Sequence, residues 1–381
     1  MKVTYSLQNT QLSHDILKGS EIEDTVTEIL SDNEFKINDL VFLLKTHEIQ
    51  RLGLIGNKIR EDLYGKKVSF INNIILNYTN VCVTYCKFCA FYRPPGHKES
   101  YTVSKEEILN RIVFAKTNYD IKQVLFQGGH NPKLNTEYFE DVFNSIRTKC
   151  PDVAIHGLSA SEIDMISRVD KSSPREVLSR LKHAGLESLP GAGAEMLVDE
   201  VKEIISPLKI SSQTWLDIME TAHDLGIKSS ATMMYGTVES IEQRARHIIK
   251  IAELQKKTKG FMAFIPWSFE PNNTEINESG IVQFPMGGFE LLKMISVSRI
   301  VFKGLIDHLQ SSWLTNGIGM AQLAIYHGSD DFGGTLIGEE VVSATGARST
   351  ELLAQNIINA IKAMGYIPVE RRNNYEVIKH F

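Results

Sequence analysis

Residues 69–89 read SFINNIILNYTNVCVTYCKFC, an apolar run followed directly by three closely spaced cysteines. The isoleucines and leucine of this run favour a buried strand that ends near Asn77. Cys82, Cys86 and Cys89 then lie in the loop that follows the strand. The segment therefore predicts a strand that delivers a reactive, cysteine-rich loop at its C-terminal end.

The same order of strand, turn and helix recurs along the chain. Stretches with apolar residues three or four positions apart predict helices between the strands, one of them beginning near Ser211 and ending before Gly226. Residues 338–346, GEEVVSATG, predict a short helix with Glu339 and Glu340 at its N-terminus. The further predicted strands are Lys122–Gln127, Val153–Leu158, Glu187–Pro190, Lys228–Tyr235, Gly260–Ile265, His308–Leu314 and a short one near Asp331.

Seven or eight strands alternating with helices predict an α/β fold, a parallel (β/α) TIM-type barrel that is full or partial. Residues 1–66 have helical spacing of apolar residues and are predicted to form an N-terminal helical extension. Residues 67–381 are predicted to form the barrel and its C-terminal elements. Reactive groups of such barrels gather at the C-terminal ends of the strands, where the cysteines are expected.

The composition limits the classes of partner. The 381 residues are 43% hydrophobic and 23% charged, which is typical of a soluble globular protein. The formal net charge of -5, without a Lys/Arg-rich run, disfavours nucleic acid and membrane surfaces as partners and favours a small molecule. Charged residues are scattered through the first thirty positions, so neither a signal peptide nor a spanning helix is expected and a cytoplasmic location is predicted.

The cysteine spacing indicates a metal centre. Four cysteines in so long a chain do not make a disulfide framework, and Cys82, Cys86 and Cys89 form a C-x3-C-x2-C pattern. Three thiolates can hold three irons of a 4Fe–4S cluster and leave one iron open for a ligand. The alternatives are a zinc site or three incidental buried cysteines, but zinc normally has a fourth Cys or His ligand, and His97 and Cys150 are poorly spaced for it.

The cysteine triad, with Phe88 immediately before its last member, resembles the signature of the radical S-adenosylmethionine (SAM) superfamily. The resemblance implies that the methionine part of SAM chelates the open iron. It also implies that an external one-electron reductant drives cleavage of SAM to a 5′-deoxyadenosyl radical. Phe88 is then expected to pack near the adenine.

Gln127, Gly128 and Gly129 end a predicted strand, where two glycines let the backbone approach a ligand closely. They are similar to the Gly-Gly motif of the superfamily, which contacts the methionine amino group. Taken alone, such a pair is usually only a turn. Relatives often carry an acidic residue after the glycines, whereas His130 stands here, so backbone carbonyls are expected to receive the ammonium group.

Two further residues are expected to contact SAM. The run LPGAGAE brings Glu195 to the same end of the barrel, and its carboxylate can accept hydrogen bonds from two ribose hydroxyls. A solvated loop glutamate or a charge at a helix N-terminus is the alternative. Tyr235 closes the strand ATMMYG and is a candidate adenine contact, whereas Met233 and Met234 are expected to pack in the barrel.

Longer stretches resemble the dehypoxanthine futalosine cyclase family (cyclic dehypoxanthinyl futalosine synthases) of the futalosine route to menaquinone. The resemblance implies that the radical removes hydrogen from a ribose carbon of a nucleoside-like substrate, and that the carbon radical attacks the benzoate ring. The alternatives are an aminofutalosine synthase, a deazaflavin-cofactor synthase subunit, or a non-catalytic iron–sulfur or zinc protein. The stretches are NYTNVCVTYCKFCAFYRPPG (77–96), QGGHNP (127–132), LPGAGAE (189–195), TMMYG (232–236), FIPWSFEPNNT (264–274) and DFGGTLIGEEVVSATG (331–346).

Such a substrate needs a cation for the benzoate and a dry apolar wall. Arg93 follows the cluster loop and is the candidate cation, while Trp267 and Trp313 are candidate wall residues at strand ends. A surface charge for Arg93 and a core position for Trp267 are the alternatives. Removal of the ring proton calls for a general base, for which His156 and Asp331 are the candidates.

Overall fold

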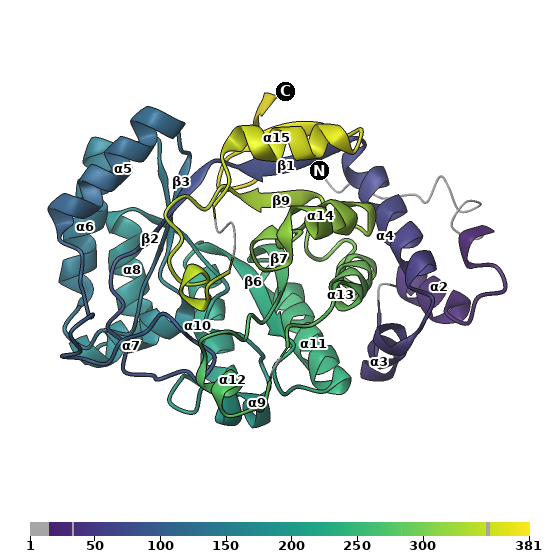
Figure 1. Cartoon of the computed structure of the whole chain (residues 1–381), viewed down its shortest axis with the longest axis horizontal. Helices are drawn as coiled ribbons and strands as arrows, with labels where there is room; N and C mark the ends of the chain where they lie inside the picture. The colour runs from purple at the N-terminus through teal and green to yellow at the C-terminus, as the bar shows by residue number, and fades with distance from the viewer. Residues whose placement is uncertain (1–14, 33, 283, 348–350) are drawn as a thin grey trace.

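The computed structural model describes residues 15–32, 34–282, 284–347 and 351–381. Its centre is a curled sheet of seven parallel strands that follow one another in chain order, with helices on the outside (Figure 1). This is a partial TIM-type barrel, as the alternation of strands and helices predicts. The strands are β2 (Asn73–Asn77), β3 (Gln123–Gln127), β4 (Ala154–Gly157), β5 (Leu186–Leu189), β6 (Lys228–Tyr235), β7 (Phe261–Ser268) and β8 (His308–Leu309).

Most of the long outer helices begin at a capping side chain. Ser211 accepts a hydrogen bond from the Thr214 amide at the start of α10, and Ser240 accepts one from Gln243 at the start of α11. The predicted start near Ser211 is thus confirmed. The helices are α5 (Lys105–Tyr119), α6 (Thr136–Lys149), α7 (Ala160–Asp170), α8 (Pro174–Ala184), α9 (Asp199–Ile205), α10 (Ser212–Asp224), α11 (Ile241–Thr258), α12 (Glu275–Glu278), α13 (Gly288–Val301) and α14 (Trp313–Tyr326).

A second sheet lies beside the open edge of the barrel. Its four strands have the order β11–β10–β1–β9, and α15 (Ala354–Ala363) lies along it in Figure 1. An isolated bridge between Gln310 and Asp331 links β9 to the β8 side, and another between Ile74 and Ile337 links the following residues to β2. The gap between β8 and β2 is therefore spanned by bridges. The bounds are β1 (Lys67–Ile71), β9 (Asp331–Gly334), β10 (Ile367–Arg371) and β11 (Val377–His380).

Three predicted elements differ from the structure. The single strand predicted across Ile71–Leu76 is two strands, β1 and β2, which belong to different sheets, and the side chain of Asn72 between them donates a hydrogen bond to the Tyr119 carbonyl. The strand predicted at His308–Leu314 ends at Leu309, since Ser312 has a φ of 54° and α14 begins at the next residue. The helix predicted at 338–346 is only a short 3-10 helix, η1 (Ser343–Thr345).

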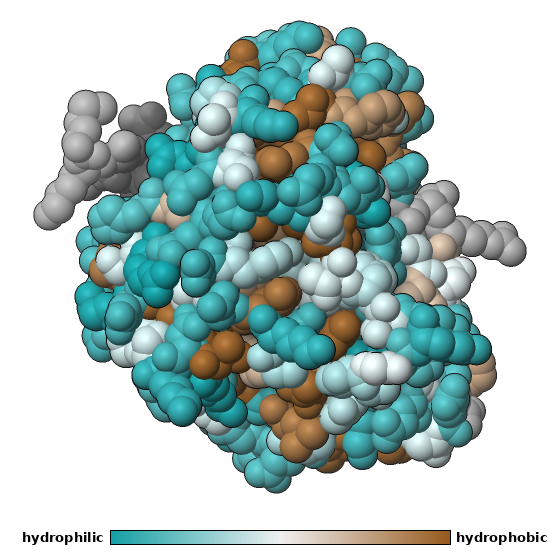
Figure 2. Space-filling model, turned by 90° about the vertical axis from the view of Figure 1, so that its left-hand side faces the viewer, coloured by the Kyte–Doolittle hydropathy of each residue, from teal (hydrophilic) through white to brown (hydrophobic). Residues whose placement is uncertain are grey.

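The N-terminal helices pack against α11, α13 and α14, on the opposite side of the molecule from α5 and α6 (Figure 1). Gly56 of α4 allows this packing, because a Cβ there would lie 2.2 Å from the carbonyl oxygen of His327. No described helix is long and apolar enough to cross a membrane, and the face in Figure 2 shows apolar side chains in separate patches. The three helices are α2 (Glu23–Asp32), α3 (Ile37–Lys45) and α4 (Ile49–Tyr64).

Candidate active site

One cavity of about 390 Å³ runs through the interior of the barrel. At one end it is lined by the three cysteines and by Gln127, the last residue of β3. At the other end it is lined by Asn373, whose side-chain oxygen accepts a hydrogen bond from Gln123, the first residue of β3. The cavity therefore extends between the C-terminal and the N-terminal ends of the strands.

The thiols of Cys82, Cys86 and Cys89 all line this cavity. The Thr84 hydroxyl lies 3.0 Å from the Cys82 sulfur and 3.5 Å from the Cys86 sulfur. Burial raises the pKa of Cys86 to about 12, although the nearby Lys209 ammonium opposes the shift. In the described part of the chain, no three Cys, His, Asp or Glu side chains are arranged to hold a single metal ion. Three cysteines on one short loop are suitable donors for a 4Fe–4S cluster that keeps one iron open.

The two glycines after β3 let this strand end lie against the cysteine loop. A Cβ on Gly129 would lie 2.3 Å from the Val81 carbonyl oxygen, and one on Gly128 would lie 2.8 Å from the Tyr78 ring. The Gly129 amide also donates a hydrogen bond to the Thr79 carbonyl at 2.8 Å. The close approach that requires glycine here is thus made to the chain's own loop.

Glu162 is a cavity residue that the sequence reasoning missed. Its carboxylate accepts hydrogen bonds from the Gly128 amide at 3.0 Å and the Tyr78 hydroxyl at 2.8 Å. The amide and hydroxyl of Ser159 donate to its other oxygen, and burial raises the pKa of Glu162. The Ser-x-x-Glu pattern at 159–162 was the available signal, because it marks a capping box directly after β4.

Glu195 lies at the cysteine end of the cavity. One of its oxygens accepts a hydrogen bond from Lys209 at 2.7 Å, and the Lys209 ammonium lies 5.6 Å from the centre of the Phe88 ring. The other oxygen, Oε2, is buried and has no partner among the described residues. A buried acceptor without a donor fits a ligand with hydroxyl groups, such as a ribose. Lys209 gave no signal in the sequence that could have identified it.

Residues 371–376, which we call the floor segment, close the other end of the cavity. Asn373 donates a hydrogen bond to the Ser188 hydroxyl at 2.9 Å, and that hydroxyl lies 2.6 Å from Nδ1 of His156. His156 lines the cavity. Its burial, together with the charge of Arg371, lowers the pKa of His156 to about 3, so the imidazole is neutral at pH 7.

Asp331, the second candidate base, is engaged elsewhere. Arg371 donates to its two carboxylate oxygens at 2.5 and 3.1 Å, and the Ser69 hydroxyl and the Gly333 amide also donate to it. Asp331 is fully buried and is not among the residues that line the cavity, whereas Arg371 is. The role of general base does not fit this position of Asp331.

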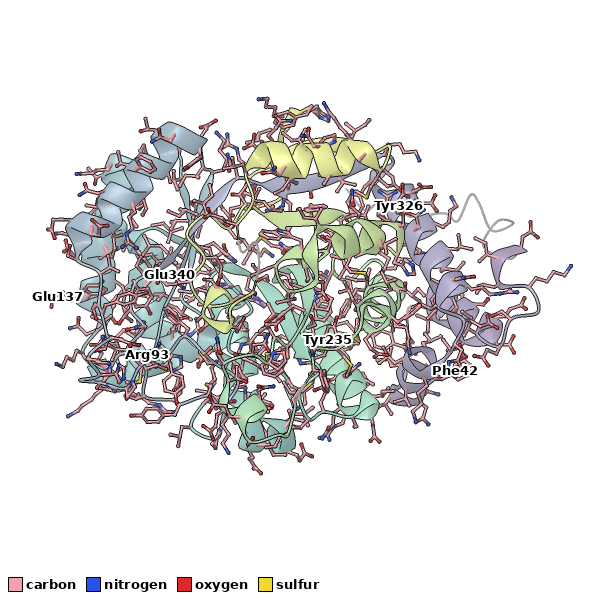
Figure 3. All side chains as sticks on the ribbon, in the orientation of Figure 1. Phe42, Arg93, Glu137, Tyr235, Tyr326 and Glu340 are labelled. Atoms are coloured by element: carbon pink, nitrogen blue, oxygen red, sulfur yellow. The ribbon has the colours of Figure 1, made fainter. Side chains whose placement is uncertain are left out.

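Arg93 and Tyr235 are not among the cavity-lining residues, and Figure 3 shows them well apart. Arg93 forms an ion pair with Glu99 at 2.8 Å and donates to the Tyr92 carbonyl, so the predicted contact with a benzoate does not fit its position. The Tyr235 ring is buried, with the Arg244 guanidinium 5.3 Å from its centre, so the predicted adenine contact does not fit its position.

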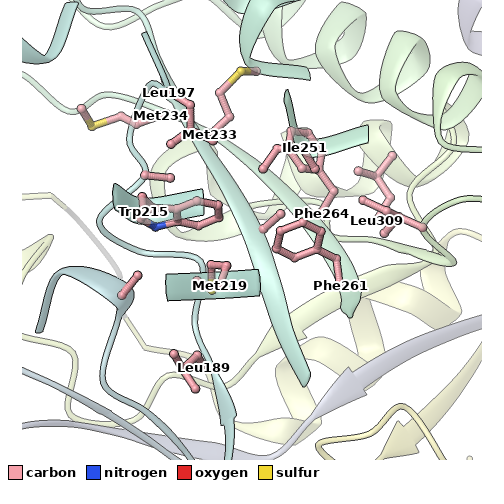
Figure 4. Packing of buried hydrophobic residues seen from close by; sticks show 14 of the residues in the cluster. Leu189, Leu197, Trp215, Met219, Met233, Met234, Ile251, Phe261, Phe264 and Leu309 are labelled. Carbon is pink, nitrogen blue, oxygen red and sulfur yellow. The ribbon is translucent and has the colours of Figure 1, made fainter. Parts of the chain in front are cut away.

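The other predicted site residues line the cavity, and the two methionines lie in the core. Trp267 and Trp313 both line the cavity, and the Trp313 indole donates a hydrogen bond to the Gly334 carbonyl at 3.0 Å. Met233 and Met234 pack in the hydrophobic core with residues such as Leu197 (Figure 4). Phe88, Gln127, Gly128, Gly129, Glu195 and His156 line the same cavity as the cysteines.

The model of the radical SAM superfamily matches residues 76–251, and that of the CofH/MqnC C-terminal region matches residues 258–380. A relative from Streptomyces coelicolor, named cyclic dehypoxanthine futalosine synthase, is 39% identical over 88% of this chain and 83% of its own. The chain belongs to the radical SAM superfamily. A Halalkalibacterium halodurans protein of the same name is 36% identical over 94% of this radical SAM chain and 96% of its own.

Other relatives of this radical SAM enzyme carry a different name. A protein from Methanothermobacter thermautotrophicus, named 5-amino-6-(D-ribitylamino)uracil–L-tyrosine 4-hydroxyphenyl transferase, is 34% identical over 87% of this chain and 90% of its own. Among solved structures, methylornithine synthase has a TM-score of 0.68 at 18% identity, covering 90% of this chain and 97% of its own. The hydrogenase maturase HydG has a TM-score of 0.71 at 15% identity, covering 95% of this chain and 79% of its own. At these identities the structures show the shared fold.

Radical SAM enzymes use a 4Fe–4S cluster and SAM, and the residues of this chain fit both groups. Cys82, Cys86 and Cys89 would be the donors for the cluster, and the unpartnered oxygen of Glu195 would be available to the ribose of SAM. When bound, the two groups together supply a 5′-deoxyadenosyl radical. The chain itself would hold them at the cysteine end of the cavity and keep water out.

Proposed function

We propose that this radical SAM enzyme cyclises dehypoxanthine futalosine, by hydrogen removal from its ribose and attack of the ribose carbon on the benzoate ring. The relatives with the cyclase name are 39% and 36% identical to this chain, against 34% for the transferase from Methanothermobacter thermautotrophicus. The shape of the cavity carries the proposal, because its cysteine end and its Arg371 end are lined by different polar groups. An elongated substrate with a sugar at one end and a charged ring at the other would suit such a cavity.

The middle of the cavity supports the same function. Ile75 of β2, Leu125 of β3, and Met262, Ile265 and Trp267 of β7 line it and offer an apolar wall. An apolar wall excludes water from the reacting groups. The polar groups are concentrated at the two ends, where they can fix the orientation of a bound substrate.

We further propose that His156 accepts the proton that leaves the ring. Its Nδ1 is engaged with the Ser188 hydroxyl, and its other ring nitrogen has no partner in the part of the chain that the structure describes. Because the imidazole is neutral, that nitrogen can take up a proton. A substrate anion near Arg371 would raise the pKa of His156 by screening the guanidinium charge.

The test is incubation of the anaerobically reconstituted enzyme with SAM, a reductant and each candidate substrate. Dehypoxanthine futalosine is expected to give 5′-deoxyadenosine and a product that is lighter than the substrate by two hydrogen atoms. The competing function is the transferase, for which 5-amino-6-(D-ribitylamino)uracil and tyrosine are supplied together. A coupled product from that pair, with no lighter product from dehypoxanthine futalosine, would overturn the proposal.

A further inference from the structure

We propose that Arg371 binds the carboxylate of the substrate, so that the floor segment determines which molecules fit the cavity. The inference rests on the function proposed above and assigns a residue to the charged end of that substrate. Arg371 is the last residue of β10 and lines the cavity, although it is only 3% exposed.

The hydrogen bonds of Arg371 leave donors free on the cavity side. Nε and Nη2 donate to Asp331, and Nη1 donates to the Arg372 carbonyl at 3.1 Å. A guanidinium has five N–H groups, so one N–H on each Nη nitrogen has no partner among the described residues. Buried donors rarely stay without a partner, and a carboxylate in the cavity would supply two acceptor oxygens.

The guanidinium is held in a fixed orientation before a substrate arrives. Its carbon lies 3.7 Å from the centre of the Tyr375 ring, and that ring stacks on His308 at 3.8 Å. The Gln310 side chain donates to the Tyr375 hydroxyl at 3.3 Å. Asp331 fixes the other edge of the guanidinium. A planar group fixed in this way loses little freedom on binding and suits a carboxylate better than lysine does.

The charges around the cavity favour the floor as the place for an anion. Lys209 and Arg371 are the two lysine or arginine side chains among the described lining residues, and Lys209 is paired with Glu195 at the cysteine end. Glu162 lies beside the Gly128 amide, at that same end. A substrate carboxylate placed there would meet two acidic side chains, whereas at the floor it meets the edge of Arg371 that Asp331 does not occupy.

The dimensions of the barrel agree with this orientation. Gln123 and Gln127 are the first and last residues of β3, and four strand steps separate them, which is about 13 Å. The first of them contacts the floor segment and the second lies at the cysteine end. A substrate with its sugar near the cysteines therefore extends its ring toward Arg371.

The experiment compares dehypoxanthine futalosine with an analogue in which the ring carboxylate is a carboxamide. The wild-type enzyme is expected to have a KM about 10- to 100-fold higher for the amide, the range for hydrogen bonds to a charged group. Arg371→Gln is expected to raise the KM for the acid by a similar factor and to bring the acid-to-amide ratio close to one. Arg371→Lys, which keeps the charge, is expected to restore part of the preference for the acid.

Two further variants guard against a loss of folding. Arg371→Gln leaves Asp331 unpaired, so Arg371→Gln/Asp331→Asn is measured beside it. Arg60→Gln is the matched control, because Arg60 is also fully buried against a tyrosine ring, that of Tyr366, but does not line the cavity. Arg60→Gln is expected to lower the thermal midpoint and to keep the wild-type acid-to-amide ratio.

The outcomes separate this inference from the proposed function. If wild-type enzyme turns over acid and amide with equal KM, or if both Arg371→Gln proteins keep the preference for the acid, Arg371 does not bind the carboxylate. If wild-type enzyme forms no cyclised product from the acid, the proposed function fails at the first step. A ratio near one in the Arg371→Gln proteins alone, with turnover retained, supports the assignment.

Discussion

Replacing Gly129 with alanine is expected to displace the cysteine loop without unfolding the barrel. The new Cβ would lie 2.3 Å from the Val81 carbonyl oxygen and 3.0 Å from Cβ of Cys82. Carbon atoms pack at about 3.5–4.0 Å, so the loop must retreat by roughly 1 Å. Such overpacking costs about 1–3 kcal/mol of folding free energy. A displacement of this size at a reactive group can lower the rate about 100-fold.

The assay is the rate of 5′-deoxyadenosine release from SAM, measured anaerobically together with iron content and the thermal midpoint. Gly319→Ala is the matched control, since an added Cβ at this exposed position of α14 would meet no atom within 4 Å. It should leave the rate unchanged and raise stability by up to about 1 kcal/mol, because alanine favours a helix. If Gly129→Ala takes up full iron and cleaves SAM at the wild-type rate, the close approach to Val81 has no functional importance.

Three more outcomes are expected. Cys86→Ala should abolish 5′-deoxyadenosine formation while the protein stays folded, whereas Cys150→Ala, outside the loop, should keep it; normal cleavage by Cys86→Ala would contradict the cluster assignment. Glu195→Gln should weaken SAM binding roughly tenfold in calorimetry and lower the thermal midpoint, because Lys209 loses its buried partner; unchanged affinity would exclude a ribose contact. Burial lowers the pKa of His247 to about 3, below the unfolded value of about 6.5. The contribution of His247 to the free energy of unfolding is therefore fully present above pH 6.5 and is lost as the pH falls toward 3. At pH 5 the loss is about 2 kcal/mol. Thermal unfolding of His247→Gln should depend less on pH over this range.

The sequence predicted the parts of this protein that depend on local patterns. The bounds of β6 match the predicted strand Lys228–Tyr235 residue for residue, because Gly226 before the run and Gly236 after it mark its ends in the sequence. Glu195 and Trp267 line the cavity as expected, since parallel strands bring their C-terminal ends together. The spacing of the three cysteines was enough to predict a cluster-binding loop.

The floor of the cavity could not be predicted in the same way. Arg371 reaches the barrel because β10 pairs with β1, from which it is separated by about three hundred residues, and no local pattern reports such a contact. Arg93 is close to the cysteines in sequence, and this closeness alone predicted its contact with the benzoate. Its backbone pairs with Asn80 and Val81, and this arrangement directs its side chain to Glu99.

The floor segment has a consequence for how such enzymes diversify. Residues 76–251, which match the superfamily model, contain the cysteines and Glu195, while the segment that touches the opposite mouth of the barrel comes from the last dozen positions of the chain. On the proposal that Arg371 binds the substrate carboxylate, exchanging a few residues of this segment would change the preferred substrate while the cysteines and Glu195 stay intact.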